Sequence, residues 1–129
     1  MSSDSLPRYM IASEVSVIIN RSVDALKRDR LNHKGLPFYR LESGRSLYRS
    51  DDVQRAMGCT PVALAPLAGS LSEVSLLRLL RLKSRQTLRR WNHRGIGPLC
   101  NGRSYVSNHV EAWLCCKRVD TLSYEDSRS

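Results

Sequence analysis

The sequence lacks the features of three classes of protein. No apolar run approaches the roughly 20 residues that a membrane-spanning helix needs. The opening MSSDSLPRYM has neither the basic start nor the apolar segment of a secretory signal. GxSxG, P-loop and HExxH motifs are missing, and no histidine stands at motif spacing from a nucleophile or carboxylate. We therefore expect a cytoplasmic protein without catalytic residues, cofactors or a membrane partner.

The cysteines lack a regular spacing. Cys59, Cys100 and the Cys115-Cys116 pair form no CxxC motif, so we expect reduced thiols. Zinc ligation by Cys100, His109 and the cysteine pair is a weak alternative. Structural zinc sites favour ligands about two to four residues apart, and adjacent cysteines are awkward tetrahedral partners. We therefore expect no metal site.

Acidic residues are scarce relative to basic ones. The chain has 21 Lys and Arg against 12 Asp and Glu, which gives a formal charge of +9 and a pI near 10.0. This balance favours a polyanionic partner. Many basic proteins bind no acidic partner, so the positions of the arginines have to show whether this chain binds nucleic acid.

The stretch from Ser84 to Leu114 predicts a helix, a turn, a hairpin and a second helix. Ser84 is a good N-cap, and Leu88 and Trp91 would face a core. Trp91 could instead stack on bases, but an aromatic at helical spacing with leucines favours a core position. The outer face then carries four polar side chains: Arg85, Gln86, Arg89 and Arg90. A solvated face is the alternative to DNA contact for these residues.

Glycine and proline predict where this helix ends and the hairpin begins. Gly95, Gly97 and Pro98 stop the helix. Asn101-Gly102 is a strong hairpin-turn dipeptide between Leu99-Cys100 and Ser104-Tyr105-Val106. Arg103 would lie at the hairpin tip. Ser107 would cap the second helix, whose apolar positions are Val110, Trp113 and Leu114.

A shorter helix is expected just upstream. Leu76, Leu77 and Leu80 form its apolar stripe, and Arg81-Leu82-Lys83 would make the turn into Ser84.

This region resembles the small winged helix-turn-helix DNA-binding domains of the MerR-like and phage excisionase type. The pattern is Ser-x-x-Thr-Leu-x-x-Trp, then Gly-x-Gly-Pro, a Gly-Arg wing, Tyr and a closing Ala-Trp-Leu. The matching residues are Ser84, Thr87, Leu88, Trp91, Gly95, Gly97, Pro98, Gly102, Arg103, Tyr105, Ala112, Trp113 and Leu114. Leu82 departs from the pattern, because the family often has a turn glycine there. The resemblance implies a bacterial or phage-type, nucleoid-associated protein.

The N-terminal part repeats the pattern more weakly. Val15, Ile18 and Ile19 make the stripe of a first helix, followed by an Asn20-Arg21 turn. Ser22 caps a second helix with Leu26, as Ser84 does with Leu88. Asp29 stands where the other module has Trp91.

A hairpin and a closing helix complete the first module. Residues 38–41 and 46–49 read as strands around a turn that contains Arg45. Ser50 caps a helix with Val53, Ala56 and Met57 on one face.

The predicted fold is therefore mainly α with small β-hairpin wings (α+β), as two tandem winged helix-turn-helix modules. Module 1 covers residues 9–57 and module 2 covers residues 71–118, with disordered tails at 1–8 and 119–129. The linker, residues 58–70, has two prolines, two glycines and no charge. Fully extended, its roughly 13 residues would reach about 40 Å. That length would let the two modules bind major grooves that are one turn of DNA apart. Its Val62, Leu64 and Leu67 favour the alternative of packing between the modules.

Three functions remain open. The first is a sequence-specific double-stranded DNA-binding protein that acts as a small transcriptional regulator. The MerR-like regulators it resembles add a dimerising coiled coil and an effector domain; neither is present, so ligand sensing is not expected. The second is an excisionase-like recombination directionality factor that bends attachment-site DNA. The third is a protein-interaction module.

Charge divides the expected DNA contacts unequally. The stretch from Leu76 to Arg118 contains ten basic residues and one acidic residue. The stretch from Arg8 to Met57 also contains ten basic residues, but six acidic ones. We therefore expect module 2 to anchor the protein on DNA and Arg103 to contact phosphate or the minor groove. Module 1 adds a weaker half-site or docks a protein: a recombinase, a polymerase or a second copy of the chain. The expected DNA-binding residues are Lys83, Ser84, Arg85, Gln86, Arg89, Arg90 and Arg103 in module 2, and Lys27, Arg28 and Arg45 in module 1.

Overall fold

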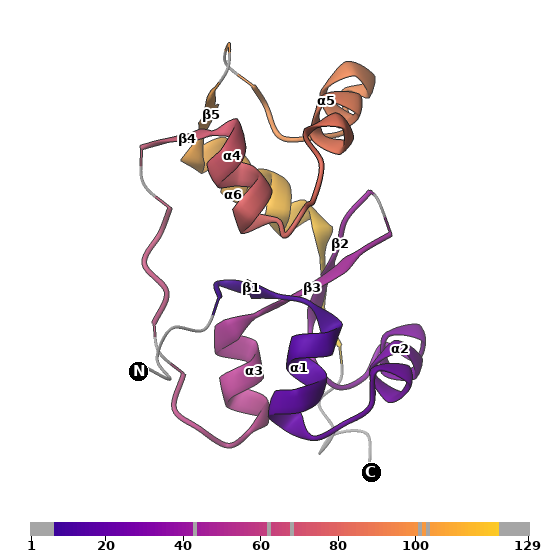
Figure 1. Cartoon of the computed structure of the whole chain (residues 1–129). Helices are drawn as coiled ribbons and strands as arrows, with labels where there is room; N and C mark the ends of the chain where they lie inside the picture. Colours follow the sequence, from indigo (N-terminus) through magenta and orange to yellow (C-terminus); the bar gives the residue numbers. More distant parts are fainter. Residues whose placement is uncertain are drawn as a thin grey trace.

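The protein is a mixed α+β chain, as the sequence predicts (Figure 1). The computed structural model describes residues 7–42, 44–61, 63–67, 69–100, 102 and 104–121. These residues form six helices and six short strands, and the strands make a four-stranded and a two-stranded antiparallel sheet. No helix in this described part has the length and apolar character to cross a membrane.

The first half of the chain builds three strands and three helices. In chain order these are β1 (Tyr9–Met10), α1 (Ala12–Ile19), α2 (Val23–Leu31), β2 (Phe38–Arg40), β3 (Ser46–Arg49) and α3 (Ser50–Ala56). Strand β3 lies between β1 and β2, with Met10 opposite Tyr48 and Tyr39 opposite Leu47. The predicted hairpin of residues 38–49 is thus present.

The second half repeats most of this order. Its elements are β4 (Ser70–Ser72), α4 (Glu73–Leu79), α5 (Arg85–Arg94), β5 (Ser104–Val106) and α6 (Ser107–Lys117). Both halves turn between their first two helices on a residue with left-handed backbone, Asn20 (φ 54°) and Arg81 (φ 58°). Arg81, rather than Leu82, therefore occupies the place that favours glycine.

The predicted hairpin of the second half was wrong in its pairing. Leu99 and Cys100 form no strand, and β5 instead pairs with β4 through Leu71 and Tyr105. Pro98 lacks the N–H that a ladder needs, whereas β4 brings a continuous backbone edge to β5. Asn101 and Arg103 lie outside the described residues, so the turn and its tip arginine stay predictions.

One hydrophobic core joins the two halves. Its buried members from the first half are Tyr9, Tyr39, Leu41 and Leu47, and those from the second half include Leu76, Leu80, Leu88, Tyr105, Val110 and Leu114. Leu67 of the linker packs against this cluster, and its N–H donates to Glu111 Oε1 at 2.8 Å. Leu67 is thus packed on the shared core, whereas Gly58, Cys59, Thr60, Ala63, Ala65 and Pro66 of the same linker are exposed; Val62 lies outside the described residues.

The chain also returns to its first half after α6. Strand β6 (Arg118–Val119) pairs with the free edge of β2, and Thr121 donates to the carbonyl of Gly35 at 2.8 Å. Val119 thus belongs to a sheet, not to the disordered tail that the sequence predicted. Arg8, expected in the other tail, donates to the carbonyl of Ala65 at 2.6 Å. Arg8 and Thr121 thus have partners that lie far away in sequence, which local composition does not reveal.

Candidate nucleic-acid interface

Helix α5 is capped at both ends and buried along one side. Ser84 Oγ accepts a hydrogen bond from the Gln86 N–H at 3.1 Å, and Gly95 ends the helix with φ 72°. Leu88 and Trp91 are buried in the shared core. Trp91 packs against Trp113 with ring centroids 5.8 Å apart, so it belongs to the core and is not free to stack on a base.

The opposite side of α5 is exposed and basic. Every residue predicted to contact DNA there is exposed: Lys83, Ser84, Arg85, Gln86, Arg89 and Arg90. His93 and Arg94, one turn further, extend this surface, and neither was among the predicted DNA-binding residues. In the described part of the chain, Arg90 and Lys83 form no ion pair. Their charges are therefore available to an anion.

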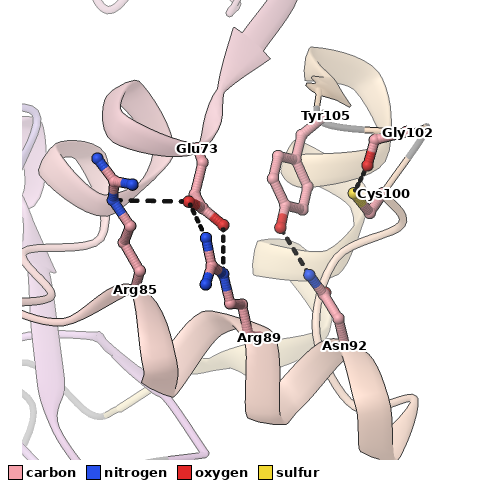
Figure 2. A pocket seen from close by; sticks show the side chains of 7 residues that line it. All are labelled: Glu73, Arg85, Arg89, Asn92, Cys100, Gly102 and Tyr105. Carbon is pink, nitrogen blue, oxygen red and sulfur yellow. Dashed lines mark hydrogen bonds and ion pairs between the residues drawn. The ribbon is translucent and has the colours of Figure 1, made fainter.

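Arg85 and Arg89 share one carboxylate. Their Nε atoms lie 3.7 and 3.4 Å from oxygens of Glu73, in the first turn of α4 (Figure 2). Glu73 lies outside the stretch from Leu76 to Arg118 over which charges were compared, and nothing in the sequence indicates that it contacts α5. Only the packing of α4 against α5 brings this acidic residue to the arginines.

These side chains line a hollow beside α5. It has a volume of about 510 Å³, and its described lining is Glu73, Arg85, Arg89, Asn92, Cys100, Gly102 and Tyr105. Asn92 Nδ2 donates to the Tyr105 hydroxyl at 2.6 Å. Burial raises the pKa of Tyr105. The hydroxyl thus stays protonated at neutral pH, and the hollow has polar atoms on both walls.

Helix α2 presents a different surface. Asp24, Lys27 and Arg28 are exposed on it, together with the apolar side chains of Val23 and Leu31. Opposite charges and apolar groups are mixed along this face. It resembles neither a uniformly basic helix nor a core-facing one.

Asp29 explains part of this difference. Its carboxylate is buried and accepts hydrogen bonds from Arg21 Nε at 2.7 Å and Nη2 at 2.8 Å. The sequence showed only that Asp29 replaces the tryptophan of the other half. In the structure Asp29 binds Arg21 within the first half, so the charge of Arg21 stabilises the fold.

Arg45 lies at the contact between the halves. Its Nη1 donates to the carbonyl of Arg81 at 2.9 Å, because the β2–β3 hairpin reaches the turn between α4 and α5 (Figure 1). Arg81 in turn donates from both terminal nitrogens to Glu14 at 2.8 Å. Hydrogen bonding from Arg81 lowers the pKa of Glu14. The predicted DNA contact of Arg45 competes with this internal bond.

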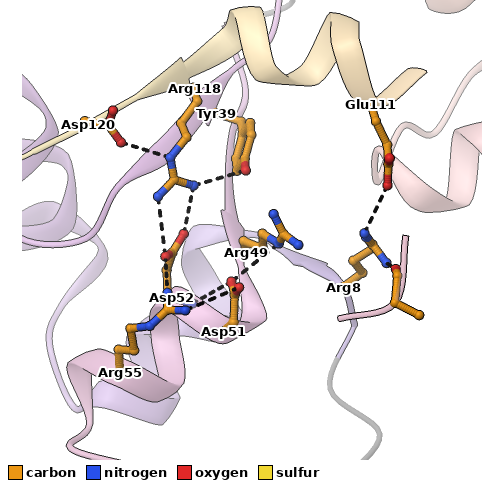
Figure 3. Close-up of polar contacts among 10 residues, drawn as sticks. Arg8, Tyr39, Arg49, Asp51, Asp52, Arg55, Glu111, Arg118 and Asp120 are labelled. Atoms are coloured by element: carbon orange, nitrogen blue, oxygen red, sulfur yellow. Dashed lines mark hydrogen bonds and ion pairs between the residues drawn. The ribbon is translucent and has the colours of Figure 1, made fainter. Parts of the chain in front are cut away.

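The junction of α6 and β6 adds further ion pairs across the halves (Figure 3). Arg118 bonds the buried carboxylate of Asp52 at 3.1 Å and the Tyr39 hydroxyl at 3.0 Å. Burial alone would lower the pKa of Arg118, but the bonds to Asp52 and Tyr39 outweigh it and raise that pKa. Lys117 pairs with Glu42. Three basic residues that the sequence analysis counted towards DNA binding, Arg81, Lys117 and Arg118, therefore hold the halves together.

The cysteines are free thiols on the surface. Cys59, Cys100, Cys115 and Cys116 are all exposed. In the described residues, no three His, Cys, Asp or Glu side chains gather in a group able to hold a metal ion.

Comparison with known proteins adds no further identification. No protein-family model, curated protein or solved structure matches the chain.

Proposed function

We propose that this protein binds double-stranded DNA sequence-specifically and acts as a small transcriptional regulator. The observation that carries the proposal is the exposed surface of α5, where Arg85, Gln86, Arg89 and Arg90 project from a capped helix. An α-helix fits the major groove, and Arg and Gln side chains bond guanine and adenine edges there. The formal charge of +9 favours the same partner.

In this proposal each half is a winged helix-turn-helix unit. Helices α1 and α2 in one half, and α4 and α5 in the other, are joined by short turns with a left-handed residue. A serine caps the second helix of each pair, Ser22 in α2 and Ser84 in α5. The β2–β3 hairpin is the wing of the first unit, and the loop before β5 is that of the second. This repeat supports the resemblance to MerR-like and excisionase-type domains.

The two units have different tasks. The second anchors the protein on DNA through α5. The first contributes a weaker half-site through Lys27 and Arg28, or docks a protein partner, because α2 carries Asp24 and exposed apolar side chains.

The shared core favours a second candidate, an excisionase-like factor that bends DNA. Since the halves are packed as one unit, α2 and α5 hold a fixed mutual position, and both lie on the right-hand side of Figure 1. A duplex that engages both helices has to fit that spacing. Bending a 20–30 base-pair site costs about 1–6 kcal/mol, which extra contacts can offset.

Genome-wide mapping of bound DNA in the organism of origin tests these proposals. Enrichment at promoters supports the regulator, and enrichment at attachment sites supports the bending factor. Without any enrichment, both are wrong and a protein-docking function takes their place. Selection from a random duplex pool is the in vitro counterpart, since a sequence-specific binder enriches one motif.

A further inference from the structure

The hollow beside α5 gathers two arginines around a single carboxylate. In Figure 2, Arg85 and Arg89 rise from α5 towards Glu73, while Asn92 and Tyr105 form the other wall. Among the described residues that line the hollow, Glu73 is the one acidic side chain. Without the charge of Glu73, the described lining of the hollow would carry only the positive charges of Arg85 and Arg89.

The ion pairs of Glu73 are looser than those that hold the halves together. The closest approaches of Arg85 and Arg89 to its oxygens are 3.7 and 3.4 Å, and the two arginine side chains are 60% and 64% exposed. The pair between Arg81 and Glu14, in contrast, has two bonds of 2.8 Å and is half-buried. Exposed pairs of long side chains contribute little to stability. Although the Glu73 side chain itself is only 24% exposed, its two pairs have long distances and exposed arginines, so we expect their exchange for another anion to cost little stability.

A phosphate is the anion that suits this arrangement. A guanidinium presents several N–H donors in a fixed fork that matches two oxygens of a carboxylate or of a phosphate. The arginines also belong to the same surface as Gln86 and Arg90, which would face base edges. A backbone phosphate beside the groove would therefore lie within their reach.

We propose that this hollow binds a DNA backbone phosphate, and that Glu73 occupies its place in the free protein as an internal competitor. The inference rests on the DNA-binding function proposed above and adds a phosphate site to it. Release of Glu73 accompanies binding, so its charge lowers the affinity for every duplex. The position of this carboxylate, rather than the net charge alone, sets how tightly α5 binds.

The test compares Glu73→Gln with a variant of the same net charge. Asp120→Asn also removes one negative charge, but from an exposed residue beside β6 that pairs with Arg118. At 0.15 M salt, charges separated by more than about 8 Å are largely screened. Thermal unfolding of both variants first establishes that they fold, and fluorescence anisotropy then measures their affinity for a labelled duplex.

We expect Glu73→Gln to bind duplex DNA about two- to fivefold more tightly than the wild type, since loose exposed pairs are worth about that factor. Asp120→Asn should change the affinity by less than about 1.5-fold. Equal affinities for Glu73→Gln and the wild type, a weaker Glu73→Gln, or an equal gain in both variants would overturn the competitor role.

A second probe separates failure of this inference from failure of the proposed function. Inorganic pyrophosphate is titrated into each protein while NMR follows the Nε–H signals of Arg85 and Arg89. Shifts at these two arginines at lower pyrophosphate concentration in Glu73→Gln support the phosphate site, even if no protein binds DNA. If the arginine signals do not move in either protein, the hollow is not a phosphate site.

Discussion

Helices α2 and α5 occupy equivalent places in the repeat, yet their exposed surfaces differ in kind. On α5 the positions are filled by Gln86, Arg89 and Arg90, and on α2 by Asp24, Lys27 and Arg28. The α2 surface also exposes Leu31, of which 68% is accessible. The same local fold therefore carries two surfaces: α5 has no acidic residue of its own, whereas α2 exposes Asp24.

The surroundings of the two helices sharpen this contrast. Beside α2, Arg21 is committed to Asp29, and Arg30 bonds the Tyr48 hydroxyl. Beside α5, the carboxylate of Glu73 holds its arginines loosely. Arg21 and Arg30 thus bond to groups within the first half, whereas the arginines of α5 are held only loosely. The two halves therefore differ in where their arginines lie and what these arginines bind, more than in how many arginines they have.

The largest expected effect tests whether the halves unfold together. Leu80→Ala removes a fully buried side chain from the shared core and should lower the free energy of unfolding by about 2–5 kcal/mol. Urea denaturation should show one transition by both Trp fluorescence, which reports the second half, and NMR signals of the first half. Leu31→Ala, at an exposed site, should change stability by less than about 0.5 kcal/mol. Separate transitions would show that the halves are independent.

Matched arginines in α5 and α2 give the next largest effect. Arg90→Ala should weaken binding to the preferred duplex by about 1–3 kcal/mol, the worth of a bidentate base contact. Arg28→Ala, at the equivalent place in α2, should cost less than about 1 kcal/mol. Mobility shifts with a selected duplex measure both. Equal losses would mean that the helices share base reading.

A smaller effect follows from exchanging the polar residue that differs most between the helices. Gln86→Asp copies α2 onto α5 and should reduce affinity by about 1–2 kcal/mol, because it removes an adenine reader and adds a repelling charge. Asp24→Gln should raise affinity by about 0.5 kcal/mol at low salt, with the gain shrinking as salt rises. Anisotropy titrations at several salt concentrations check both. A gain from Gln86→Asp would contradict the assignment of α5.

The smallest effect concerns the contact between the halves at low pH. The pKa of Glu14 is lowered in the folded protein by its bond to Arg81, so the pair stabilises the fold above the ordinary value of 4.5. This contribution is lost as the pH falls through the lowered pKa. The side chain is 33% exposed, and we expect the contribution to be below about 1 kcal/mol.

Glu14→Gln is the control for this loss. Between pH 5 and 3 its melting temperature should fall less than that of the wild type. Parallel declines of the two proteins would show that Glu14 does not couple stability to pH.

Features that depend on neighbouring residues were predictable from the sequence. The serine caps of α2 and α5, the buried stripe of Leu88 and Trp91, and the β2–β3 hairpin all follow from spacing and turn chemistry. These signals act over a few residues. The predicted caps Ser50 and Ser107 were wrong, because both lie inside their helices, α3 and α6, whose N-cap residues are Arg49 and Val106.

Features that depend on residues far apart in the chain were not predictable from the sequence. The pairing of β4 with β5, the return of β6 to β2, and the approach of Glu73 to α5 all join segments whose contact is set by the shared core. Arg45 shows the same limitation, because a hairpin arginine suits DNA or a backbone carbonyl equally well. Arg81 and Arg118 were counted from the sequence as charges available to DNA. In the folded chain both form ion pairs with carboxylates.

The central claim is that α5, not α2, anchors the protein on DNA. Because the halves share a core, separating them would disturb both, so the full chain is the proper sample. An NMR titration with a selected duplex follows the backbone amides of every residue at once. We expect the largest and earliest shifts at residues 83–94, with smaller changes at 23–31. Shifts centred on residues 23–31, with 83–94 unmoved, would contradict the account.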